Sequence, residues 1–353
     1  MHQFKPPITD RKIRIGLAGC GRIANNHYAA IEAHAANVEL VGVADIAPSA
    51  LQAAAARTGA RPYGSLTQML AEANADLIVL TTPSGLHSKQ TIEAARAGHH
   101  VMTEKPMATR WADGIAMVDA CDSAGARLFV VKQNRHNATL QLVKKAIEAG
   151  RFGRIFSVAI NVFWTRPQAY YDSASWRGTW EFDGGAFMNQ ASHYIDLLDW
   201  MIGPIESVQA YTATLGRHIE VEDTGVMTVR WRSGALGTVN VTMLTYPQNM
   251  EGSITILGDK GSVRVGGVAV NEIQHWQFAD SHPDDERISD ASYETTSVYG
   301  FGHPLYYENV IKVLRGQCEP DTDGREGLKS LEVLIAAYLS ARDGRRVPLP
   351  LHY

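Results

Sequence analysis

The chain has 353 residues, of which 45% are hydrophobic and 20% are charged, and its formal net charge is −4. This composition is typical of a globular protein, the length favours two domains over a single core, and the negative charge argues against broad binding to nucleic acid or to an anionic membrane. No apolar run approaches the roughly 18 residues of a membrane span, and the polar N-terminus does not resemble a signal peptide, so we expect a cytoplasmic protein with neither kind of partner.

Residues 12–132 alternate short apolar runs with alanine-rich helical stretches. Such alternation indicates strand–helix–strand units and a parallel sheet. The predicted strands are 13–18, 38–44, 77–81, 100–103 and 128–132, and predicted helices include 49–57, 66–72 and 88–97. We therefore expect an α/β Rossmann domain with a parallel sheet over residues 1–133.

A glycine-rich turn, Gly19-Cys20-Gly21-Arg22-Ile23-Ala24, follows the first predicted strand and begins a helix. Gly19 permits the tight turn, Gly21 lets backbone N–H groups approach a pyrophosphate, and the small Ala24 lets helix and strand pack closely. A pyrophosphate at a helix N-terminus is stabilised by unpaired N–H groups and by the helix dipole. The turn therefore predicts dinucleotide binding at Gly19, Gly21, Arg22 and Ile23, although a purely structural turn can use the same residues.

A single carboxylate, Asp45, ends the second predicted strand, 21 residues beyond Ala24. An acid at this place binds the hydroxyls of the adenosine ribose, and its charge repels the 2′-phosphate of NADP. The next residue, Ile46, offers no cation to that phosphate. The sequence therefore predicts NAD as the cofactor.

Two further motifs, Thr82-Pro83-Ser84 and Glu104-Lys105-Pro106, follow predicted strands. In an open parallel sheet, ligands bind beyond the carboxyl ends of the strands, so both motifs should face the cofactor. Proline restricts the backbone of the residue before it, here Lys105. A lysine held there can polarise or deprotonate a substrate hydroxyl. A surface lysine paired with Glu104 is the structural alternative.

Beyond residue 134 the pattern changes to long alternating segments. Alternation joined by glycine-containing turns indicates a mostly antiparallel sheet. The predicted strands are 155–164, 205–213, 225–231, 235–244, 252–257 and 262–265, and the predicted helices are 140–149, 304–315 and 327–341. We therefore expect an α+β domain with an open sheet over residues 134–353, which binds substrate. An exposed face on such a sheet usually needs a partner, so we expect a homo-oligomer, a dimer or a tetramer.

The segment 182–196 carries a second candidate site. On a helix, Asn189 and His193 are four residues apart and Asp196 is three further, so these polar groups share one face. Histidine is the side chain best suited to accept a proton near neutral pH. A histidine that is only hydrogen-bonded within the protein is the structural alternative.

Basic and amide side chains gather at residues 132–137, and again among the aromatic residues of 164–180. Arginine recognises carboxylate or phosphate, and aromatic faces suit sugar or base rings. The combination predicts an anionic, ring-containing substrate, with solvated loops or an oligomer contact as the alternative. The remaining histidines and the three distant cysteines show no metal-ligand spacing, so we expect no metal.

These motifs, in this order and over nearly the whole chain, resemble the Gfo/Idh/MocA oxidoreductase family. The marks of the family are 19–24, 82–87, 104–106 and 184–196. The resemblance implies a catalytic lysine at Lys105, a catalytic histidine at His193, and further cofactor contacts at Thr82, Pro83, Ser84, His87, Glu104, Lys105 and Gln133. Many members have an aspartate where this chain has Asn189, which cannot relay a proton as a carboxylate does.

More narrowly, segments 132–137, 164–171, 176–180 and 188–193 resemble the branch that oxidises C3 of UDP-N-acetyl-glucosaminuronic acid (UDP-GlcNAcA). That branch makes a 3-keto sugar for the diacetamido uronic acids of bacterial surface polysaccharides, including lipopolysaccharide. The resemblance implies a nucleotide-sugar substrate that contacts Lys105, Arg135, Asn137, Arg166, Tyr171, Asn189 and His193.

The expected chemistry is hydride transfer from C3 to NAD. We expect His193 to accept the hydroxyl proton and Lys105 to stabilise the alkoxide, while the reverse assignment stays open. A dehydrogenase of another sugar or of an inositol is one alternative, and a non-catalytic dinucleotide or sugar sensor is another.

Overall fold

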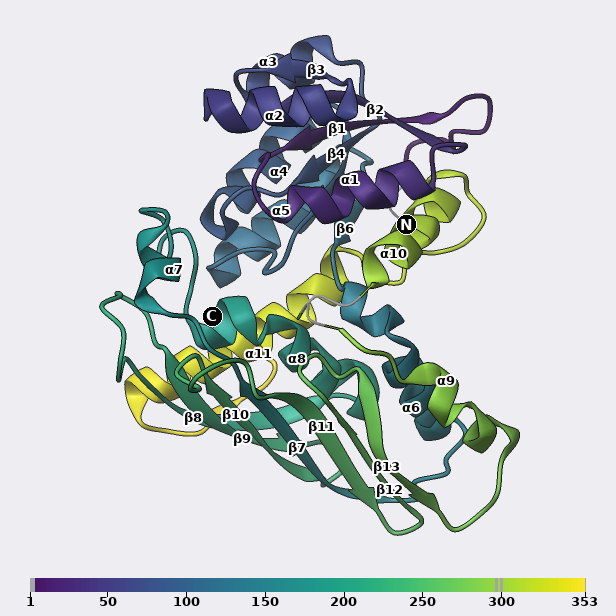
Figure 1. The fold of residues 1–353 in the computed structure, drawn as a ribbon, viewed down its shortest axis with the longest axis vertical. Helices are drawn as coiled ribbons and strands as arrows, with labels where there is room; N and C mark the ends of the chain where they lie inside the picture. Colours follow the sequence, from purple (N-terminus) through teal and green to yellow (C-terminus); the bar gives the residue numbers. More distant parts are fainter. Residues whose placement is uncertain (1–3, 296–297, 299–300, 353) are drawn as a thin grey trace. The chain divides into compact units, whose positions relative to one another are not determined.

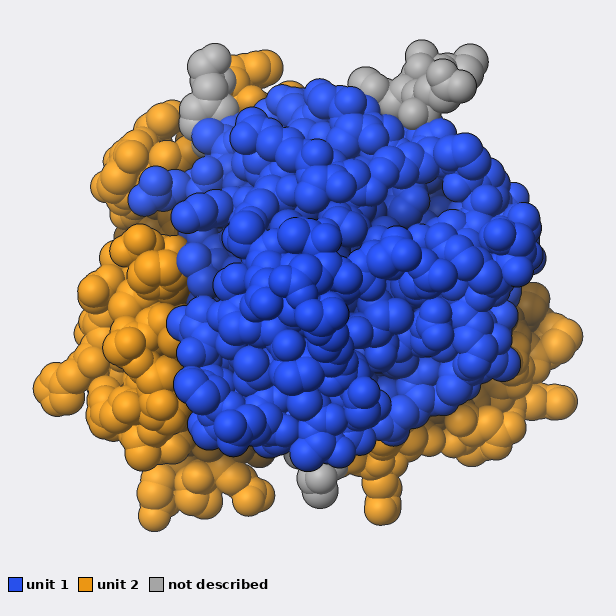
Figure 2. Space-filling model, turned by 90° about the horizontal axis from the view of Figure 1, so that it is seen from above, with its two compact units in different colours: residues 1–132, 303–331 blue, residues 133–302, 332–353 orange. Residues whose placement is uncertain are grey.

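The computed structural model describes residues 4–295, 298 and 301–352. The chain divides into two compact units, which Figure 2 colours separately: residues 1–132 with 303–331, and residues 133–302 with 332–353. Within the described residues, no helix is both long and apolar enough to cross a bilayer.

The first unit is built on a six-stranded parallel sheet in the order β3-β2-β1-β4-β5-β6 (Figure 1). Its strands are β1 Ile13–Ala18, β2 Val38–Ala44, β3 Arg61–Tyr63, β4 Leu77–Leu80, β5 His100–Thr103 and β6 Leu128–Val130. Its helices are α1 Ala24–Ala33, α2 Pro48–Thr58, α3 Leu66–Glu72, the 3₁₀ turn η1 Ser84–Leu86, α4 His87–Arg96 and α5 Trp111–Ser123. The predicted Rossmann architecture is confirmed. The short edge strand β3 was not predicted, because two of its three residues are exposed and give no apolar run.

Pairing in this sheet aligns the last residues of four strands. Ala18 of β1 pairs with Ala44 of β2 and with Leu80 of β4, and Leu80 pairs with Thr103 of β5. The segments that follow these residues therefore leave the sheet at one edge, which is the ligand-binding edge of an open parallel sheet.

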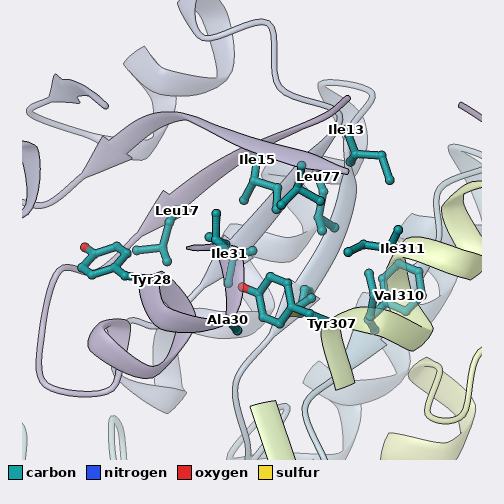
Figure 3. Packing of buried hydrophobic residues seen from close by; sticks show 14 of the residues in the cluster. Ile13, Ile15, Leu17, Tyr28, Ala30, Ile31, Leu77, Tyr307, Val310 and Ile311 are labelled. Atoms are coloured by element: carbon teal, nitrogen blue, oxygen red, sulfur yellow. The ribbon is translucent and has the colours of Figure 1, made fainter. Parts of the chain in front are cut away.

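The core of this unit explains why a late segment of the chain belongs to it. Figure 3 shows Ile13, Ile15 and Leu77 of the sheet packed with side chains of α10 (Gly302–Leu314). Tyr307 and Val310 of this helix are each only 1% exposed. The sequence places all of 134–353 in one domain, whereas in the structure 303–331 packs with the first unit. Burial of these large apolar side chains against the Rossmann sheet accounts for the difference.

The second unit is built on an eight-stranded sheet in the order β13-β12-β11-β7-β10-β9-β8-β14. Its strands are β7 Ile155–Phe163, β8 Ile205–Ala213, β9 Thr224–Trp231, β10 Leu236–Thr242, β11 Glu251–Gly258, β12 Gly261–Gly266, β13 Glu272–Phe278 and β14 Val347–Pro348. The prediction of a mostly antiparallel sheet is confirmed, and the β7–β10 pair is parallel. Strand β13 was missed because it is largely exposed and lacks a clear apolar alternation.

The helical segments of this unit are η2 Gln133–His136, α6 Ala138–Glu148, α7 Gln168–Asp172, η3 Ala186–Gln190, α8 Ser192–Leu197, η4 Leu198–Ile202, η5 Pro283–Arg287 and α9 Ile288–Ala291. Helix α11, Gly324–Asp343, begins in the first unit and ends in the second.

One face of the second sheet is buried and the other is exposed. Along β9, Met227, Val229 and Trp231 are at most 3% exposed, and the residues between them are exposed. The exposed face nevertheless carries large apolar side chains on four strands, namely Tyr211, Val226, Leu236 and Leu257, which are 42–69% exposed.

Candidate active site

The glycine turn has the geometry that dinucleotide binding requires. Gly19 has φ +97°, and a Cβ atom there would lie 2.7 Å from the backbone of Thr81 and Thr82, so only glycine fits. At Gly21 a Cβ atom would meet nothing within 4 Å, so the backbone lies open for a ligand to approach. Ala24 is fully buried at the start of α1. The three positions match the tight-turn, close-approach and packing roles of the motif.

Asp45 ties the turn to the start of α2. Its Oδ2 accepts a hydrogen bond from the backbone N–H of Cys20 at 2.6 Å, and its Oδ1 accepts one from Ala47 at 2.7 Å. Each carboxylate oxygen has a second lone pair, so the half-buried group retains acceptor capacity for ribose hydroxyls.

His87 joins the two motifs that follow β4 and β5. Its Nε2 lies 2.9 Å from the carbonyl oxygen of Thr82, and its Nδ1 lies 2.9 Å from that of Pro106. Burial lowers the pKa of the ring, and the two carbonyl oxygens oppose that shift. Both ring nitrogens thus face backbone oxygens, which gives His87 a clear structural role in holding the two loops together. Pro83 and Ser84 lie in the loop that it holds.

Glu104 is buried, and its carboxylate accepts hydrogen bonds from three directions. Oε1 lies 3.1 Å from Nε2 of His27 and 3.4 Å from Nε2 of His303, and Oε2 accepts the backbone N–H of Lys105 at 3.0 Å. His27 in turn contacts the hydroxyl of Tyr307 at 2.8 Å. Although burial opposes ionisation, the two histidines hold the pKa of Glu104 well below its usual range. Lys105 itself is half-buried.

In the second unit, the candidate histidine is paired with an amide. Nε2 of His193 lies 3.1 Å from Nε2 of Gln133, and both residues are buried. Gln133 follows β6 directly, whereas His193 lies on α8, so the contact joins segments 60 residues apart. Which ring nitrogen carries the proton follows from the orientation of this amide.

The helix that carries His193 is not one regular α-helix. Its first turn, η3, and its last, η4, are π-helical, and only α8 between them is α-helical. The expectation that Asn189, His193 and Asp196 share one α-helical face therefore holds only for His193 and Asp196, which lie on α8. Asn189 lies on η3, where its amide donates to Asp183.

Arg135 and Asp196 form a bidentate ion pair. Nε and Nη2 of Arg135 lie 2.7 and 2.8 Å from the two carboxylate oxygens, and both side chains are at least 93% shielded from solvent. The pair joins η2 to α8 and neutralises the charge of Arg135. The neighbouring Asn137 is also buried, at the start of α6.

Glu222 and Tyr338 hold the start of η3. The Glu222 carboxylate accepts hydrogen bonds from the Phe187 N–H and from the Tyr338 hydroxyl, both at 2.9 Å, and that hydroxyl accepts one from the Met188 N–H. Burial raises the pKa of Glu222 to about 7. A Cβ atom on Gly185 would collide with this carboxylate, so the glycine is needed for close packing.

Within residues 164–180, arginine guanidinium groups lie over aromatic rings. The guanidinium of Arg177 lies 4.3 Å from the ring centroid of Tyr170 and 4.5 Å from that of Trp176. Arg166 lies 5.5 Å from the Tyr170 ring and donates to the Thr165 carbonyl. Tyr171 is buried, which raises the pKa of its hydroxyl. The attraction between a guanidinium group and an aromatic face helps to hold these arginine side chains in place.

The predicted residues thus gather in two groups, one in each unit. Along the aligned strand ends of the first unit lie Gly19, Gly21, Arg22, Ile23, Asp45, Thr82, Pro83, Ser84, His87, Glu104 and Lys105. Gln133, predicted to contact the cofactor, lies in the second unit beside His193.

Six contributing residues were not predicted, namely His27, Asp183, Glu222, His303, Tyr307 and Tyr338. The partners of Asp183, Gly178 and Asn189, are near it in sequence, whereas the other residues have distant partners, and no local motif marks any of them. Among the described residues, His27, Glu104 and His303 also have the separation of metal ligands, but hydrogen bonds already join them.

Comparisons with known proteins match two parts of the chain to two family models. Residues 13–132 match the family described as "Oxidoreductase family, NAD-binding Rossmann fold", and residues 144–349 match "Oxidoreductase family, C-terminal alpha/beta domain". The WlbA dehydrogenase of Chromobacterium violaceum, solved with NADH and UDP-GlcNAcA, is 72% identical over 99% of both chains, with a TM-score of 0.95.

Two further relatives support the assignment. The WlbA dehydrogenase of Bordetella pertussis, solved with the same two ligands, is 72% identical over 98% of this chain and 100% of that one, with a TM-score of 0.96. D-apiose dehydrogenase of Paraburkholderia graminis is 26% identical over 97% of this chain and 91% of its own. The chain therefore belongs to the Gfo/Idh/MocA family of NAD-binding oxidoreductases.

Proposed function

We propose that this protein oxidises the C3 hydroxyl of UDP-GlcNAcA to a 3-keto sugar, with NAD as the hydride acceptor. The observation that carries the proposal is 72% identity, over nearly the whole chain, to two dehydrogenases solved with NADH and UDP-GlcNAcA. The segments that resemble the same branch, 132–137, 164–171, 176–180 and 188–193, support it.

The strand ends of the first unit hold the cofactor. The backbone at Gly19, Gly21, Arg22 and Ile23 binds the pyrophosphate, and Asp45 binds the adenosine ribose. The open space at Gly21 supports this assignment, because a side chain there would fill it. Thr82, Pro83 and Ser84 line the same edge. His87 and Glu104 contribute to the cofactor site indirectly. His87 holds the Pro106 carbonyl, and Glu104 accepts the Lys105 N–H, so both fix the backbone at this edge of the sheet.

NAD supplies the acceptor for the hydride that leaves C3. His193 accepts the C3 hydroxyl proton, and Gln133 fixes the orientation of its ring. The Lys105 ammonium donates to the same oxygen and stabilises the developing alkoxide. Asn189 orients the sugar and cannot replace the base, because an amide does not take up a proton near neutral pH.

The remaining substrate contacts come from the second unit. Arg166 recognises the anionic groups, Tyr171 offers a ring face, and Asn137 hydrogen-bonds the sugar. Arg135, which the sequence suggested as an anion-binding residue, acts instead by orienting α8, because Asp196 already neutralises its charge.

We further propose that the protein is a cytoplasmic homo-oligomer, a dimer or a tetramer, that uses the exposed face of its second sheet. The large apolar side chains on that face support the proposal. Its product serves the biosynthesis of bacterial surface polysaccharide. Sedimentation analysis of the wild type and of Leu236→Asp tests the assembly, because a charge at a buried interface should release smaller species.

The assay that tests the function follows NADH formation during incubation with NAD and UDP-GlcNAcA, with and without a 2-keto acid to reoxidise bound NADH. Matched controls are UDP-GlcNAc, which lacks the carboxylate, and UDP-glucuronic acid, which lacks the acetamido group. The expected result is oxidation of UDP-GlcNAcA alone, with loss of two hydrogens by mass spectrometry.

Other results select the alternatives. Turnover of an inositol or a free sugar in place of UDP-GlcNAcA would assign the chain to another branch, and relatives at 26% identity include D-apiose and inositol dehydrogenases. Tight NADH binding without turnover of any sugar would support a non-catalytic sensor.

A further inference from the structure

Tyr307, His27, Glu104 and His303 form a buried cluster that is connected by hydrogen bonds. The Glu104 carboxylate stays ionised, because its pKa lies well below the usual range, so it only accepts hydrogen bonds. The Nε2 atoms of His27 and His303 must therefore carry the protons. Burial lowers the pKa of the His27 ring, and its Nδ1 lies 2.8 Å from the hydroxyl oxygen of Tyr307.

These four residues come from three elements that meet at the ligand-binding edge of the sheet. His27 lies on α1, after the glycine turn, Glu104 directly follows β5, and His303 and Tyr307 lie on α10. All four are at most 5% exposed, and the rings of His27 and His303 pack edge to face with centroids 5.2 Å apart. Close packing of this kind leaves the carboxylate little freedom to move.

The cluster also contacts the backbone of Lys105. Oε2 of Glu104 accepts the N–H of Lys105, while His87 holds the carbonyl oxygen of the next residue, Pro106. The peptide that carries the candidate catalytic ammonium is thus fixed on both sides by buried side chains. Burial of a carboxylate lowers the stability of the folded protein unless hydrogen bonds offset the desolvation of its charge.

We infer that Tyr307, His27, Glu104 and His303 are positioning residues that set the location of the Lys105 side chain for catalysis. The inference rests on the proposed function, since it assigns Lys105 a role at the reacting oxygen. A displacement of about 1 Å at a catalytic group can lower turnover by about 100-fold without weakening binding. The cluster is therefore expected to affect kcat far more than KM.

Two matched pairs of variants of the full chain test this inference. Tyr307→Phe removes only the hydroxyl that contacts His27, and Tyr306→Phe is its control, because the Tyr306 hydroxyl donates to the Val130 carbonyl instead. His303→Leu removes a donor to Glu104, whereas His303→Gln keeps an N–H group in a similar place. Thermal melting of each variant confirms that it folds.

With NAD and UDP-GlcNAcA as substrates, Tyr307→Phe should lower kcat by about 2- to 10-fold, the effect of one hydrogen bond. His303→Leu should lower it by about 10- to 100-fold. KM should change by less than about twofold in both, and His303→Gln and Tyr306→Phe should keep most of the wild-type kcat. Equal losses of kcat in both members of each pair would overturn the inference.

A second readout does not need turnover. Reductive methylation places isotope-labelled methyl groups on the lysines, and comparison with Lys105→Arg identifies the NMR signal of Lys105. That signal should shift in Tyr307→Phe and His303→Leu and stay in place in the two controls. If the wild type does not oxidise UDP-GlcNAcA, the proposed function fails while this signal still decides the positioning, and an unmoved signal contradicts it.

Discussion

Nε2 of Gln133 lies 3.1 Å from Nε2 of His193, and both side chains are buried in the second unit. The contact fixes the plane of the imidazole and selects which ring nitrogen carries the proton. A general base works only when its unprotonated nitrogen faces the proton that it takes. We therefore propose that Gln133 acts on the reaction through His193, whereas the sequence predicts that it contacts the cofactor.

The first prediction concerns this pair. Gln133→Leu should lower kcat by about 10- to 100-fold, because the ring loses its orienting partner, while the affinity for NADH stays within about threefold of the wild type. Steady-state kinetics and a fluorescence titration with NADH measure the two quantities. A loss of NADH affinity as large as the loss of kcat would instead show that Gln133 contacts the cofactor.

The second prediction separates the two catalytic candidates. His193→Ala should lower kcat by about 10²- to 10⁴-fold, the usual effect of removing a positioned base. Lys105→Met should lower kcat by about 10²- to 10³-fold, as for loss of a group that stabilises an oxyanion. Both variants should bind NADH. Retention of turnover in both would refute the mechanism.

The third prediction concerns the choice of dinucleotide. The wild type should prefer NAD to NADP, because the Asp45 carboxylate repels a 2′-phosphate. Asp45→Asn should raise KM for NAD by about 10-fold, because a charged hydrogen-bond acceptor is lost. It should also lower the ratio of kcat/KM for NAD to kcat/KM for NADP. Since Asp45 also holds Cys20 and Ala47, melting temperature serves as the control for structural damage. An unchanged ratio of kcat/KM for the two cofactors would count against this role.

The fourth prediction contrasts the two glycines of the turn. Gly19→Ala should destabilise the protein by about 1–3 kcal/mol, because φ is positive and the new methyl group would collide with the backbone of Thr81 and Thr82. Gly21→Ala should leave the melting temperature unchanged, since its Cβ meets no protein atom, yet weaken NAD binding by about 10-fold or more. Calorimetry and NADH titration distinguish the two effects, and equal destabilisation by both would contradict the assignment.

The fifth prediction follows from the carboxyl of Glu222. Burial raises its pKa from 4.5 to about 7, so the folded state binds this proton more tightly than the unfolded state does. Its contribution to stability is fully present below about pH 4.5 and is lost as the pH rises through about 7, a loss of about 3 kcal/mol.

Glu222→Gln lacks this titration, because the amide cannot ionise. Its melting temperature should therefore rise relative to the wild type between about pH 5 and about pH 8. Glu220→Gln, which alters an exposed carboxylate two residues away, is the matched control. A difference between Glu222→Gln and the wild type that does not change with pH would contradict the assignment of the proton.

Local chemistry explains what the sequence could predict. The glycine turn and Asp45 are recognisable because only certain residues fit a strand–turn–helix that approaches a pyrophosphate. Parallel pairing of β1 with β4 and of β4 with β5 then places Glu104 and Lys105 at the same edge of the sheet as that turn.

The partners of these residues depend on tertiary packing and leave no local pattern. His303 reaches Glu104 across 199 residues, and Glu222 supports η3 through Phe187, 35 residues away. The π-helical turns on either side of α8 were also unpredictable, because the apolar spacing of that segment is compatible with a regular helix. Likewise, the bidentate bond between Arg135 and Asp196 leaves no local pattern, and the sequence predicts Arg135 only as a substrate-binding residue.

The central claim is that Lys105 and His193 act on one hydroxyl group beside the nicotinamide ring. A crystal structure of the protein with NADH and UDP-GlcNAcA tests it most directly. We expect Nζ of Lys105 and a ring nitrogen of His193 both within about 2.6–3.2 Å of the C3 oxygen of the sugar. A sugar bound with C3 turned from the nicotinamide, or with either nitrogen beyond hydrogen-bonding reach of that oxygen, would contradict it.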